Sequence, residues 1–507
     1  MYPLMTGEEV RNLEDRLFES NSITPESLLD HVTDQMFAQL KPQLRQDKPI
    51  TILAGPGNNG ADAIKIARLI LAEHPKASLK VIFVECATVS ALHKKKSGEL
   101  AAQLKKVNGG NYQEYYFDEA TPIAKFITLL ENEFRNERLI IDGIFGAGLS
   151  RPLSVHIQKI IEFFNSQSAT RVAIDIPTGL DSLEGTVNPI AFEADITLTC
   201  YKPKPGFFVN EGPLHTGKIK VIKFPGIETQ VKPSSTKFVF AKKDLIKYFP
   251  RRSPVGNKST NGKLLVLAGS EGMEGAARLA SLAAARLGVG YVTVSSPSET
   301  LRSFLPPDFL WKQWDENLDF HGYDTILYGP GLGRSAETLG IFKKLLKHPN
   351  VICDADGLFS LALQVTKLPP SWILTPHAGE LSRLMRLPAS EIEANRWQIG
   401  YEAAEKFGCT ILLKGFRTTV SWTSKKSGKI HQAVITTGNS ALAKAGTGDV
   451  LAGFIAALTA QGLPSWKAAL TAASYHGNLA DQWVKEGKGN WSLMASDLLK
   501  SNRKNSL

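Results

Sequence analysis

The sequence predicts an α/β protein of two domains, each built on a mainly parallel sheet. Strand-like apolar runs alternate with helical stretches through both halves of the chain, which is typical of this class. A chain of 507 residues is too long for one hydrophobic core. Near residues 226–237 the pattern is interrupted by Gly226, Pro233, Ser234 and Ser235. We therefore expect one domain at residues 1–228 and a second at residues 236–507.

The individual elements follow from the spacing of apolar residues. In the first half we expect strands at 50–54, 81–84, 139–141, 172–174, 196–199 and 219–222, with helical spacing at 61–72 and 157–164. In the second half we expect strands at 264–268, 291–294, 325–328, 351–354, 372–374 and 410–413. The halves share no repeat, so they are predicted to be different domains.

Composition excludes several classes of protein. The four cysteines are scattered without a CxxC pair, which argues against a disulfide framework or a thiolate zinc site and favours a reducing compartment. The acidic residues Glu8, Glu9, Glu14 and Asp15 make the N-terminus unlike a secretory signal. No apolar run reaches the roughly 20 residues needed to span a bilayer. We expect a cytoplasmic protein without a membrane partner.

The formal net charge of +10 is compatible with nucleic acid, anionic membranes or small anionic ligands. Basic clusters such as 94–96 and 251–252 are short, and no RNA-binding signature surrounds them. Solvated surface is the simpler interpretation of these clusters. Phosphorylated metabolites are therefore the expected partners, and nucleic acid is not.

A glycine-rich turn at residues 445–448 leads into an apolar run at 452–458 that favours a helix. Such a helix start presents unpaired backbone N–H groups and a positive dipole end, so it suits an anion. Asp449 lies in the first turn. It could merely offset the dipole, or it could be a general base beside a bound phosphate, and the turn alone does not decide between these.

Further motifs accompany this turn in the second half. They are Gly262-Lys263, the glycine-rich segments 269–277, 288–294 and 329–333, and the blocks 354–358, 375–381 and 413–415. With the turn before Asp449, they resemble the ribokinase-like superfamily and, within it, the ADP/ATP-dependent NAD(P)H-hydrate dehydratases. The resemblance covers nearly all of residues 240–500 and implies a ribokinase-like α/β domain.

The resemblance implies a role for individual residues. Asp449 would remove the proton of an acceptor hydroxyl, with Mg²⁺ as cofactor and ADP as co-substrate. Contacts to the hydrated dinucleotide would come from Ala276, Gly331, His377 and Asp449, and contacts to the nucleotide from Lys414, Gly415, Phe416, Arg417, Thr418 and Gly448. From the residues alone, His377 could instead be a turn histidine, and Lys414 a surface lysine with a partly buried stem.

The first half carries its own glycine-rich turn. The strand at 50–54 runs into Gly55-Pro56-Gly57-Asn58-Asn59-Gly60-Ala61-Asp62, and a helix is expected to follow, which suits a pyrophosphate. Two further strands run into Asp142 and Asp175. Because parallel strands end at one edge, Asn59, Asp142, Asp175 and Thr178 can converge there. These oxygen ligands suit K⁺, Mg²⁺ or Ca²⁺ better than zinc, although helix caps and Asx-turns are an alternative.

Segments 142–151, 175–179 and 204–206, together with the turn at 55–62, are similar to NAD(P)H-hydrate epimerases over about residues 1–225. The resemblance implies a Rossmann-like domain with Asp175 and Lys204 as catalytic residues. It implies K⁺ ligands at Asn59, Asp142 and Thr178. Substrate contacts would be Asn58, Asn59, Gly60, Ala61, Asp62, Gly146, Ala147, Gly148, Leu149, Ser150, Arg151, Pro152 and Asp175.

The first half also departs from the epimerase pattern. Ala61 and Ala63 stand where the family has glycine, and they would crowd the turn if it required a positive φ. Residues 28–33 match the family's early helix poorly, whereas Thr178 replaces a serine but keeps the hydroxyl. A non-catalytic binding domain is therefore the alternative for the first half.

Together the two resemblances imply repair of hydrated NADH and NADPH. The first half would interconvert the R and S hydrates, and the second would dehydrate the S hydrate while ADP becomes AMP and phosphate. The alternative is a kinase for a vitamin precursor with a non-catalytic N-terminal domain. We also expect a homo-oligomer.

Overall fold

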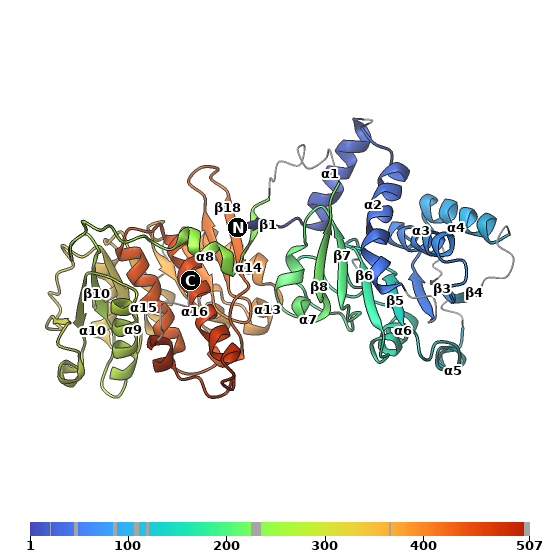
Figure 1. Cartoon of the computed structure of the whole chain (residues 1–507). Helices are drawn as coiled ribbons and strands as arrows, with labels where there is room; N and C mark the ends of the chain where they lie inside the picture. The colour runs from blue at the N-terminus through green and yellow to red at the C-terminus, as the bar shows by residue number, and fades with distance from the viewer. Residues whose placement is uncertain are drawn as a thin grey trace. The chain divides into compact units, whose positions relative to one another are not determined.

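The computed structural model describes residues 1–20, 22–44, 49–84, 89–105, 111–117, 121–149, 151–224, 235–364 and 367–500. The chain divides into two compact units, one of Pro3–Ser235 and one of Met1–Tyr2 with Thr236–Leu507 (Figure 1). We call them the N-terminal unit and the C-terminal unit. The boundary expected between residues 228 and 236 falls largely on residues 225–234, which lie outside the described residues.

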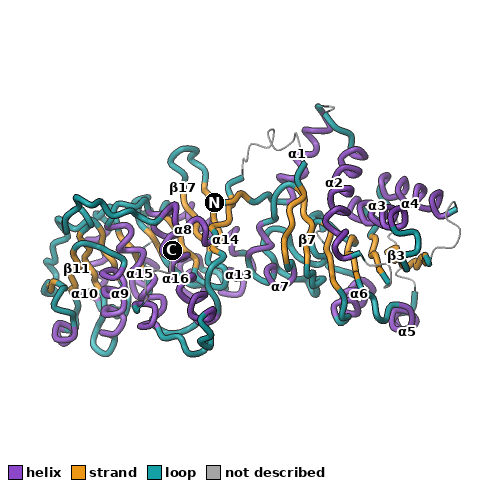
Figure 2. Tube along the Cα trace, viewed as in Figure 1, coloured by secondary structure: helices purple, strands orange, loops and turns teal. Residues whose placement is uncertain are grey.

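The N-terminal unit has seven strands in one sheet with helices packed against it (Figure 2). Its strands are β2 (Ile50–Ala54), β3 (Leu79–Val84), β4 (Tyr112–Phe117), β5 (Leu139–Gly143), β6 (Thr170–Ile174), β7 (Ile196–Cys200) and β8 (Lys218–Ile222). Its helices are α1 (Gly7–Glu19), α2 (Pro25–Leu40), α3 (Asn58–Glu73), α4 (Ala91–Leu104), α5 (Ile123–Glu133), α6 (Val155–Asn165) and α7 (Gly212–His215), with 3₁₀ turns at Lys41–Gln43 and Pro205–Phe208.

The strand order of this sheet creates a binding position. The order is β4-β3-β2-β5-β6-β7-β8, and all neighbouring strands in it pair in parallel. The chain runs outward from β2 through β3 to β4 and then returns to the other side of β2 with β5. In open α/β sheets, ligands bind beyond the carboxyl ends of strands at such a switch point.

The C-terminal unit has a larger, mixed sheet. Its strands are β1 (Tyr2–Pro3), β9 (Lys237–Phe240), β10 (Lys263–Leu267), β11 (Tyr291–Ser295), β12 (Leu310–Trp311), β13 (Thr325–Tyr328), β14 (Val351–Cys353), β15 (Ile373–Leu374), β16 (Thr410–Leu413), β17 (Thr419–Thr423) and β18 (Ile430–Ile435). Its helices are α8 (Lys242–Tyr248), α9 (Glu274–Arg286), α10 (Ala336–Leu345), α11 (Asp356–Ala362), α12 (Ala378–Met385), α13 (Ala389–Ala394), α14 (Arg396–Phe407), α15 (Thr447–Ala460) and α16 (Ser465–Lys485). Short 3₁₀ turns lie at Glu299–Phe304, Ser440–Leu442 and Ala495–Leu499.

This sheet has the order β1-β9-β18-β17-β16-β15-β14-β13-β10-β11-β12. Strand β17 is antiparallel to β16 and β18, whereas β10 to β16 pair in parallel. The chain leaves β10 toward β11 and β12 and resumes with β13 on the other side of β10. The loops that follow β10 and β13 therefore meet at a second switch point.

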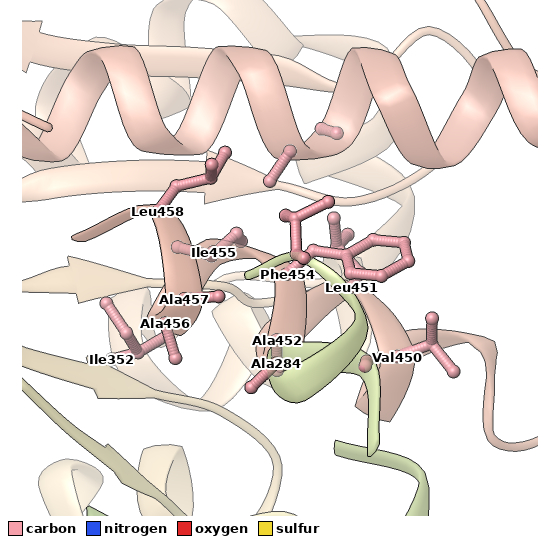
Figure 3. Close-up of a cluster of buried hydrophobic side chains, with 14 of the residues drawn as sticks. Ala284, Ile352, Val450, Leu451, Ala452, Phe454, Ile455, Ala456, Ala457 and Leu458 are labelled. Atoms are coloured by element: carbon pink, nitrogen blue, oxygen red, sulfur yellow. The ribbon is translucent and has the colours of Figure 1, made fainter. Parts of the chain in front are cut away.

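Helix α15 anchors the core of the C-terminal unit. Its sequence is rich in alanine and larger apolar residues, and nearly every position from Val450 to Ala460 is buried. A helix that is apolar on all sides belongs in a core, and α15 packs against α9, α16 and the strands β10, β13 and β14. Figure 3 shows this cluster, with Ala452 of α15 beside Ala284 of α9 and Ala456 of α15 beside Ile352 of β14. This packing fixes the first turn of α15, which carries Asp449.

Among the described residues, no helix is both long enough and apolar enough to cross a membrane.

Candidate functional site

The N-terminal unit has a pocket of about 490 Å³ at the switch point between β2 and β5. The groups around it come from α1, the start of α3, the loop after β5 and the ends of β6 and β7. They are Gly7, Val10, Arg11, Glu14, Gly57, Asn58, Asn59, Asp62, Ile144, Phe145, Gly146, Ala147, Gly148, Leu149, Arg151, Asp175, Cys200 and Lys204. Most of the substrate residues expected from the sequence therefore lie around one cavity.

Four of the expected substrate residues are exceptions. Gly60 and Ala61 are buried in α3 and do not line the pocket. Pro152 is exposed outside the lining, and Ser150 lies outside the described residues. The substrate contacts of these four residues stay predictions.

Helix α3 begins directly after the glycine-rich turn, with Gly57 as its N-cap. Residues 57–63 are all described, and none of them has a positive φ. Ala61 and Ala63 are fully buried within the helix. The crowding that a positive φ would have caused is therefore absent. Gly57, Asn58 and Asn59 at the helix start line the pocket, and the first backbone N–H groups of a helix have no partner within the helix.

Asp175 and Lys204 form an ion pair at the floor of this pocket. The Lys204 ammonium, whose side chain is fully buried, donates to Asp175 Oδ1 and, at 2.6 Å, to Thr199 Oγ1. The backbone N–H of Ala147 donates to Asp175 Oδ2 at 3.4 Å. Asp175 has φ +62°, a left-handed conformation that is uncommon for residues other than glycine and recurs at functional sites. The two expected catalytic residues are thus in direct contact.

Asp142 is fully buried next to Thr178. Its carboxylate accepts hydrogen bonds from Thr178 N at 2.8 Å, Thr178 Oγ1 at 2.7 Å and Ile144 N at 3.1 Å. Burial raises the pKa of Asp142 to about 6, although these three donors oppose the shift. A buried carboxylate with this much desolvation would be stabilised by a nearby cation.

Asn59 is the third residue that the sequence predicts as a K⁺ ligand, with Asp142 and Thr178. Its Nδ2 is buried and has no hydrogen-bond acceptor among the described residues. Rotation of the amide would exchange this nitrogen for the amide oxygen, which can ligate a hard cation. Across the described ranges, no group of three or more His, Cys, Asp or Glu could hold a metal ion. The oxygen set fits K⁺ better than a transition metal.

Two charged pocket residues were missed in the sequence, Arg11 and Glu14 of α1. The signal for Glu14 lay in its spacing. Val10, Leu13 and Leu17 form the inner stripe of the helix at positions i, i+3 and i+7, and Glu14 occupies position i+4 of the same stripe. An acidic residue on an otherwise apolar stripe indicates that its carboxyl group lies at a buried site or beside a buried partner.

In the C-terminal unit, Asp449 lies in the first turn of α15. The N-cap is Gly446 at φ +85°, a left-handed conformation that glycine adopts without steric cost, and no side chain caps the helix. Burial raises the pKa of Asp449 to about 7, and the negative charges of Asp354 and Glu380 add to the shift, while Lys414 opposes it. A carboxyl group with this pKa can accept a proton near neutral pH.

Lys414 joins the acidic residues beside this turn. Its Nζ lies 2.8 Å from Asp354 Oδ1 and 3.5 Å from Glu380 Oε2. The two carboxylates raise the pKa of Lys414, although burial opposes that shift. A Cβ added to Gly448 would lie 3.8 Å from Lys414 Nζ, so the lysine reaches the glycine turn. Lys414 is therefore not a surface lysine, and two residues expected at the nucleotide lie together.

Two residues expected at the hydrated dinucleotide also meet. Gly331 has φ +56°, and a Cβ placed on it would lie 2.9 Å from Ala276 Cβ and 3.0 Å from Met273 O. Glycine is needed here because a side chain would disfavour this backbone conformation and would also clash with these two atoms. Because Ala276 follows β10 and Gly331 follows β13, the contact lies at the second switch point.

His377 caps helix α12. Its Nδ1 accepts from Gly379 N at 3.0 Å, and its backbone N–H donates to Glu380 Oε2 at 2.8 Å. The ring is 57% exposed. The turn role expected as an alternative is therefore present, and a contact with substrate stays a prediction.

The segment from Lys414 to Thr418 forms a tight loop between β16 and β17. Thr418 Oγ1 donates to Gly415 O at 3.3 Å, and Arg417 stacks on the Phe416 ring with 5.2 Å between the guanidinium carbon and the ring centroid. Arg417 also donates to Thr436 O. The half-exposed Phe416 ring is available to a nucleotide base.

Comparison with known proteins assigns each half to a family. Residues 264–503 match the family model described as NAD(P)H-hydrate dehydratase, and residues 25–206 match the YjeF-related protein N-terminus. The bifunctional NAD(P)H-hydrate repair enzyme Nnr of Coxiella burnetii is 31% identical over 98% of this chain and 98% of its own length. The chain belongs to the family of bifunctional NAD(P)H-hydrate repair enzymes.

Other members of this repair family align in the same way. The Nnr enzyme of Moorella thermoacetica is 30% identical over 98% of this chain and 95% of its own length. A solved structure, the ADP/ATP-dependent NAD(P)H-hydrate dehydratase of Bacillus subtilis co-crystallized with ATP/Mg²⁺, is 30% identical. It covers 52% of this chain and 95% of its own, with a TM-score of 0.46.

Proposed function

We propose that this chain repairs hydrated NADH and NADPH. The N-terminal unit interconverts the R and S hydrates, and the C-terminal unit returns the S hydrate to NAD(P)H while ADP is converted to AMP and phosphate. The observation that carries the proposal is Asp449, which lies at the start of α15 with its pKa raised to about 7 by burial. A general base is most effective when its pKa is near the working pH.

In the dehydratase step, Asp449 accepts the proton of the hydroxyl on C6 of the nicotinamide ring. The hydroxyl oxygen attacks the terminal phosphorus of ADP, and AMP leaves with the electron pair of the broken P–O bond. Phosphate then departs from C6, and loss of the C5 proton restores the ring double bond. Lys414 and the first amides of α15 are the cationic and dipolar groups that offset charge on the transferred phosphoryl group.

Mg²⁺ fits this site as an ion that arrives with the nucleotide. Asp354 and Glu380 are the carboxylates beside Lys414, and Mg²⁺ commonly takes one or two carboxylates together with substrate phosphates and water. When bound, it would neutralise phosphate charge during transfer. We propose ADP as the co-substrate, and the alternative, ATP, is one arm of the test below.

In the epimerase step, Asp175 is the proposed acid/base at C6, and Lys204 holds its carboxylate in place. The proposed K⁺ ligands are Asn59, Asp142 and Thr178, whose donor atoms are all oxygens. When bound, K⁺ would supply a fixed positive charge for the substrate's phosphate groups. The proposed domain limits remain residues 1–228 and 236–507.

The test is to give the purified full-length chain a mixture of R and S NADH hydrates with Mg²⁺, K⁺ and either ADP or ATP. We expect NADH absorbance at 340 nm to return fully with ADP, because epimerisation feeds the R hydrate to the dehydratase. A stable phosphorylated alcohol without return of NADH would favour the vitamin-precursor kinase instead. If NADH forms at the enzymatic rate only from the S hydrate in the mixture, the N-terminal unit is non-catalytic. The homo-oligomer stays a prediction, which light scattering can check.

A further inference from the structure

Glu14 lines the pocket of the N-terminal unit together with Asp175, but from a different element. Helix α1 carries it, and the buried side chains of Leu13 and Leu17 hold that helix in the core. The helix start also packs closely on the loop after β5, because a Cβ on Gly7 would lie 3.1 Å from Ala147 O. The packing of α1 against the core and the β5 loop therefore holds the Glu14 carboxyl at the cavity.

The environments of the two carboxyl groups differ. Asp175 pairs with the buried ammonium of Lys204, which stabilises its negative charge. Glu14 accepts one hydrogen bond, from Tyr201 OH at 3.2 Å. Burial raises the pKa of Glu14 to about 7, and the negative charge of Asp175 adds to the shift, while Tyr201 and Lys204 oppose it. Glu14 therefore holds a proton up to neutral pH, whereas Asp175 is the carboxylate that contacts the Lys204 ammonium.

We propose that Glu14 is a second catalytic residue of the epimerase site, exchanging a proton with the C6 hydroxyl of the hydrate in partnership with Asp175. This inference rests on the proposed epimerase function of the N-terminal unit. Inversion at C6 moves the hydroxyl from one face of the ring to the other, so one C6–O bond breaks and another forms. Departure of the first hydroxyl needs an acid, and arrival of the second needs a base.

The protons and electrons balance as follows. Glu14 gives its proton to the C6 hydroxyl, the C6–O pair leaves with water, and the N1 lone pair forms a double bond to C6. A water molecule then adds to the other face of C6, the N1=C6 pair returns to N1, and Asp175 takes the released proton. The reverse reaction uses the same two groups with exchanged roles. The active form therefore carries one proton on the pair.

Other titratable groups face this pair from the surrounding elements. They are Arg11 of α1, Asp62 of α3, Arg151 after β5, and Cys200, Tyr201 and Lys204 at the end of β7. Burial raises the pKa of Cys200 well above its ordinary value, and it raises the pKa of Asp62 as well. Burial thus favours the neutral form of both groups.

The experiment uses the full-length chain and follows R-to-S conversion by chromatography over pH 5 to 9 without nucleotide. For the unaltered protein we expect kcat/KM to fall above about pH 7, as Glu14 loses its proton. Glu14→Gln should lower kcat about 10²- to 10⁴-fold and abolish that descending limb. Tyr201→Phe removes a hydrogen bond that lowers the pKa of Glu14, so it should move the limb to higher pH.

The matched control is Glu8→Gln, the same change at an exposed position of α1 outside the pocket lining. It should keep the epimerase rate and its pH profile, and circular dichroism checks the fold of every variant. If the unaltered chain epimerises the hydrates and Glu14→Gln keeps its rate and its limb, the role of Glu14 is overturned while the proposed function stands. If the unaltered chain does not epimerise them, the proposed function fails and the role of Glu14 falls with it.

Discussion

Lys414 Nζ lies 2.8 Å from Asp354 Oδ1, an ion pair between residues 60 positions apart in the chain. The Asp354 carboxylate is 2% exposed and also accepts a hydrogen bond from Thr375 Oγ1 at 2.8 Å. The same ammonium approaches the turn that begins α15. One lysine therefore joins a buried ion pair of the C-terminal unit to the proposed phosphate site.

Lys414→Met separates these two contributions. It leaves Asp354 charged and buried without its partner, and breaking such a pair costs roughly 3–5 kcal/mol. We expect a lower unfolding midpoint in calorimetry and at least a tenfold weaker affinity for ADP. Adding Asp354→Asn should restore most of the stability, because the buried Asp354 charge is then removed, but it should not restore ADP binding.

The control for this prediction is Lys426→Met, which removes the same charge from an exposed position. It should leave both the midpoint and ADP affinity unchanged. Recovery of ADP binding in the Lys414→Met, Asp354→Asn double variant would show that the lysine acts only on stability.

Asp449→Asn tests whether Asp449 is the general base of the dehydratase step, as proposed. We expect kcat to fall about 10²- to 10⁴-fold while affinity for ADP changes little. In the unaltered protein, kcat/KM should decrease tenfold for each pH unit below about 7, because the carboxyl group is protonated there and cannot accept a proton. Stopped-flow measurement of NADH formation across pH 5 to 9 gives both results.

Asp354→Asn provides a second arm of the same test. It removes the negative charge that contributes most, after burial, to raising the pKa of Asp449. The acid limb should therefore move to lower pH. Asp308→Asn, an exposed aspartate, serves as the control and should leave the profile unchanged. An acid limb that persists in Asp449→Asn would assign the titration to another group.

Most strands and the convergence of the sites could be predicted, because apolar runs identify parallel strands and parallel strands end at one edge. Strand β4, Tyr112–Phe117, was missed because it contains no aliphatic residue and is interrupted by the polar pair Gln113 and Glu114. It is an edge strand, so half-exposed positions suffice. The antiparallel β17 and β18 were also missed.

The pairings within the sites depend on tertiary structure. Glu380 and Asp354 stand in recognisable motifs, but the sequence could not indicate that both carboxylates approach one lysine. Glu14 precedes Asp175 by more than 150 residues, and only the folded chain brings α1 over the pocket. Long-range contacts of this kind follow from packing, on which local patterns carry little information.

Removal of K⁺ tests the oxygen ligands of the N-terminal unit. Burial raises the pKa of Asp142 to about 6, so above that pH the folded protein holds an ionised, desolvated carboxylate, which lowers its stability. A cation offsets this penalty only while the carboxyl is ionised. We therefore expect KCl to raise the free energy of unfolding of the N-terminal unit above pH 6, by up to about 2.7 kcal/mol at a hundredfold excess over Kd, and by less at lower pH.

The same titration with NaCl at equal ionic strength, and with the exposed substitution Asp15→Asn, controls for general salt effects. Asp142→Asn should abolish the difference between K⁺ and Na⁺. Equal stabilisation by both ions in the unaltered protein would remove the case for a K⁺ site.

The packing of β5 on α3 gives a prediction that depends on geometry alone. A Cβ on Gly143 would lie 2.5 Å from Ala63 Cβ and 3.1 Å from Asn59 O. Gly143→Ala should therefore destabilise the N-terminal unit by roughly 1–3 kcal/mol and, because it displaces Asn59, lower the epimerase rate.

In an Ala63→Gly background the closest clash is removed, so the same substitution should cost less. A double-mutant cycle of urea unfolding should give a coupling of about 0.5–3 kcal/mol. Additive effects would mean that the strand and helix separate freely, and the tight contact would then not be what fixes Asn59 at the pocket.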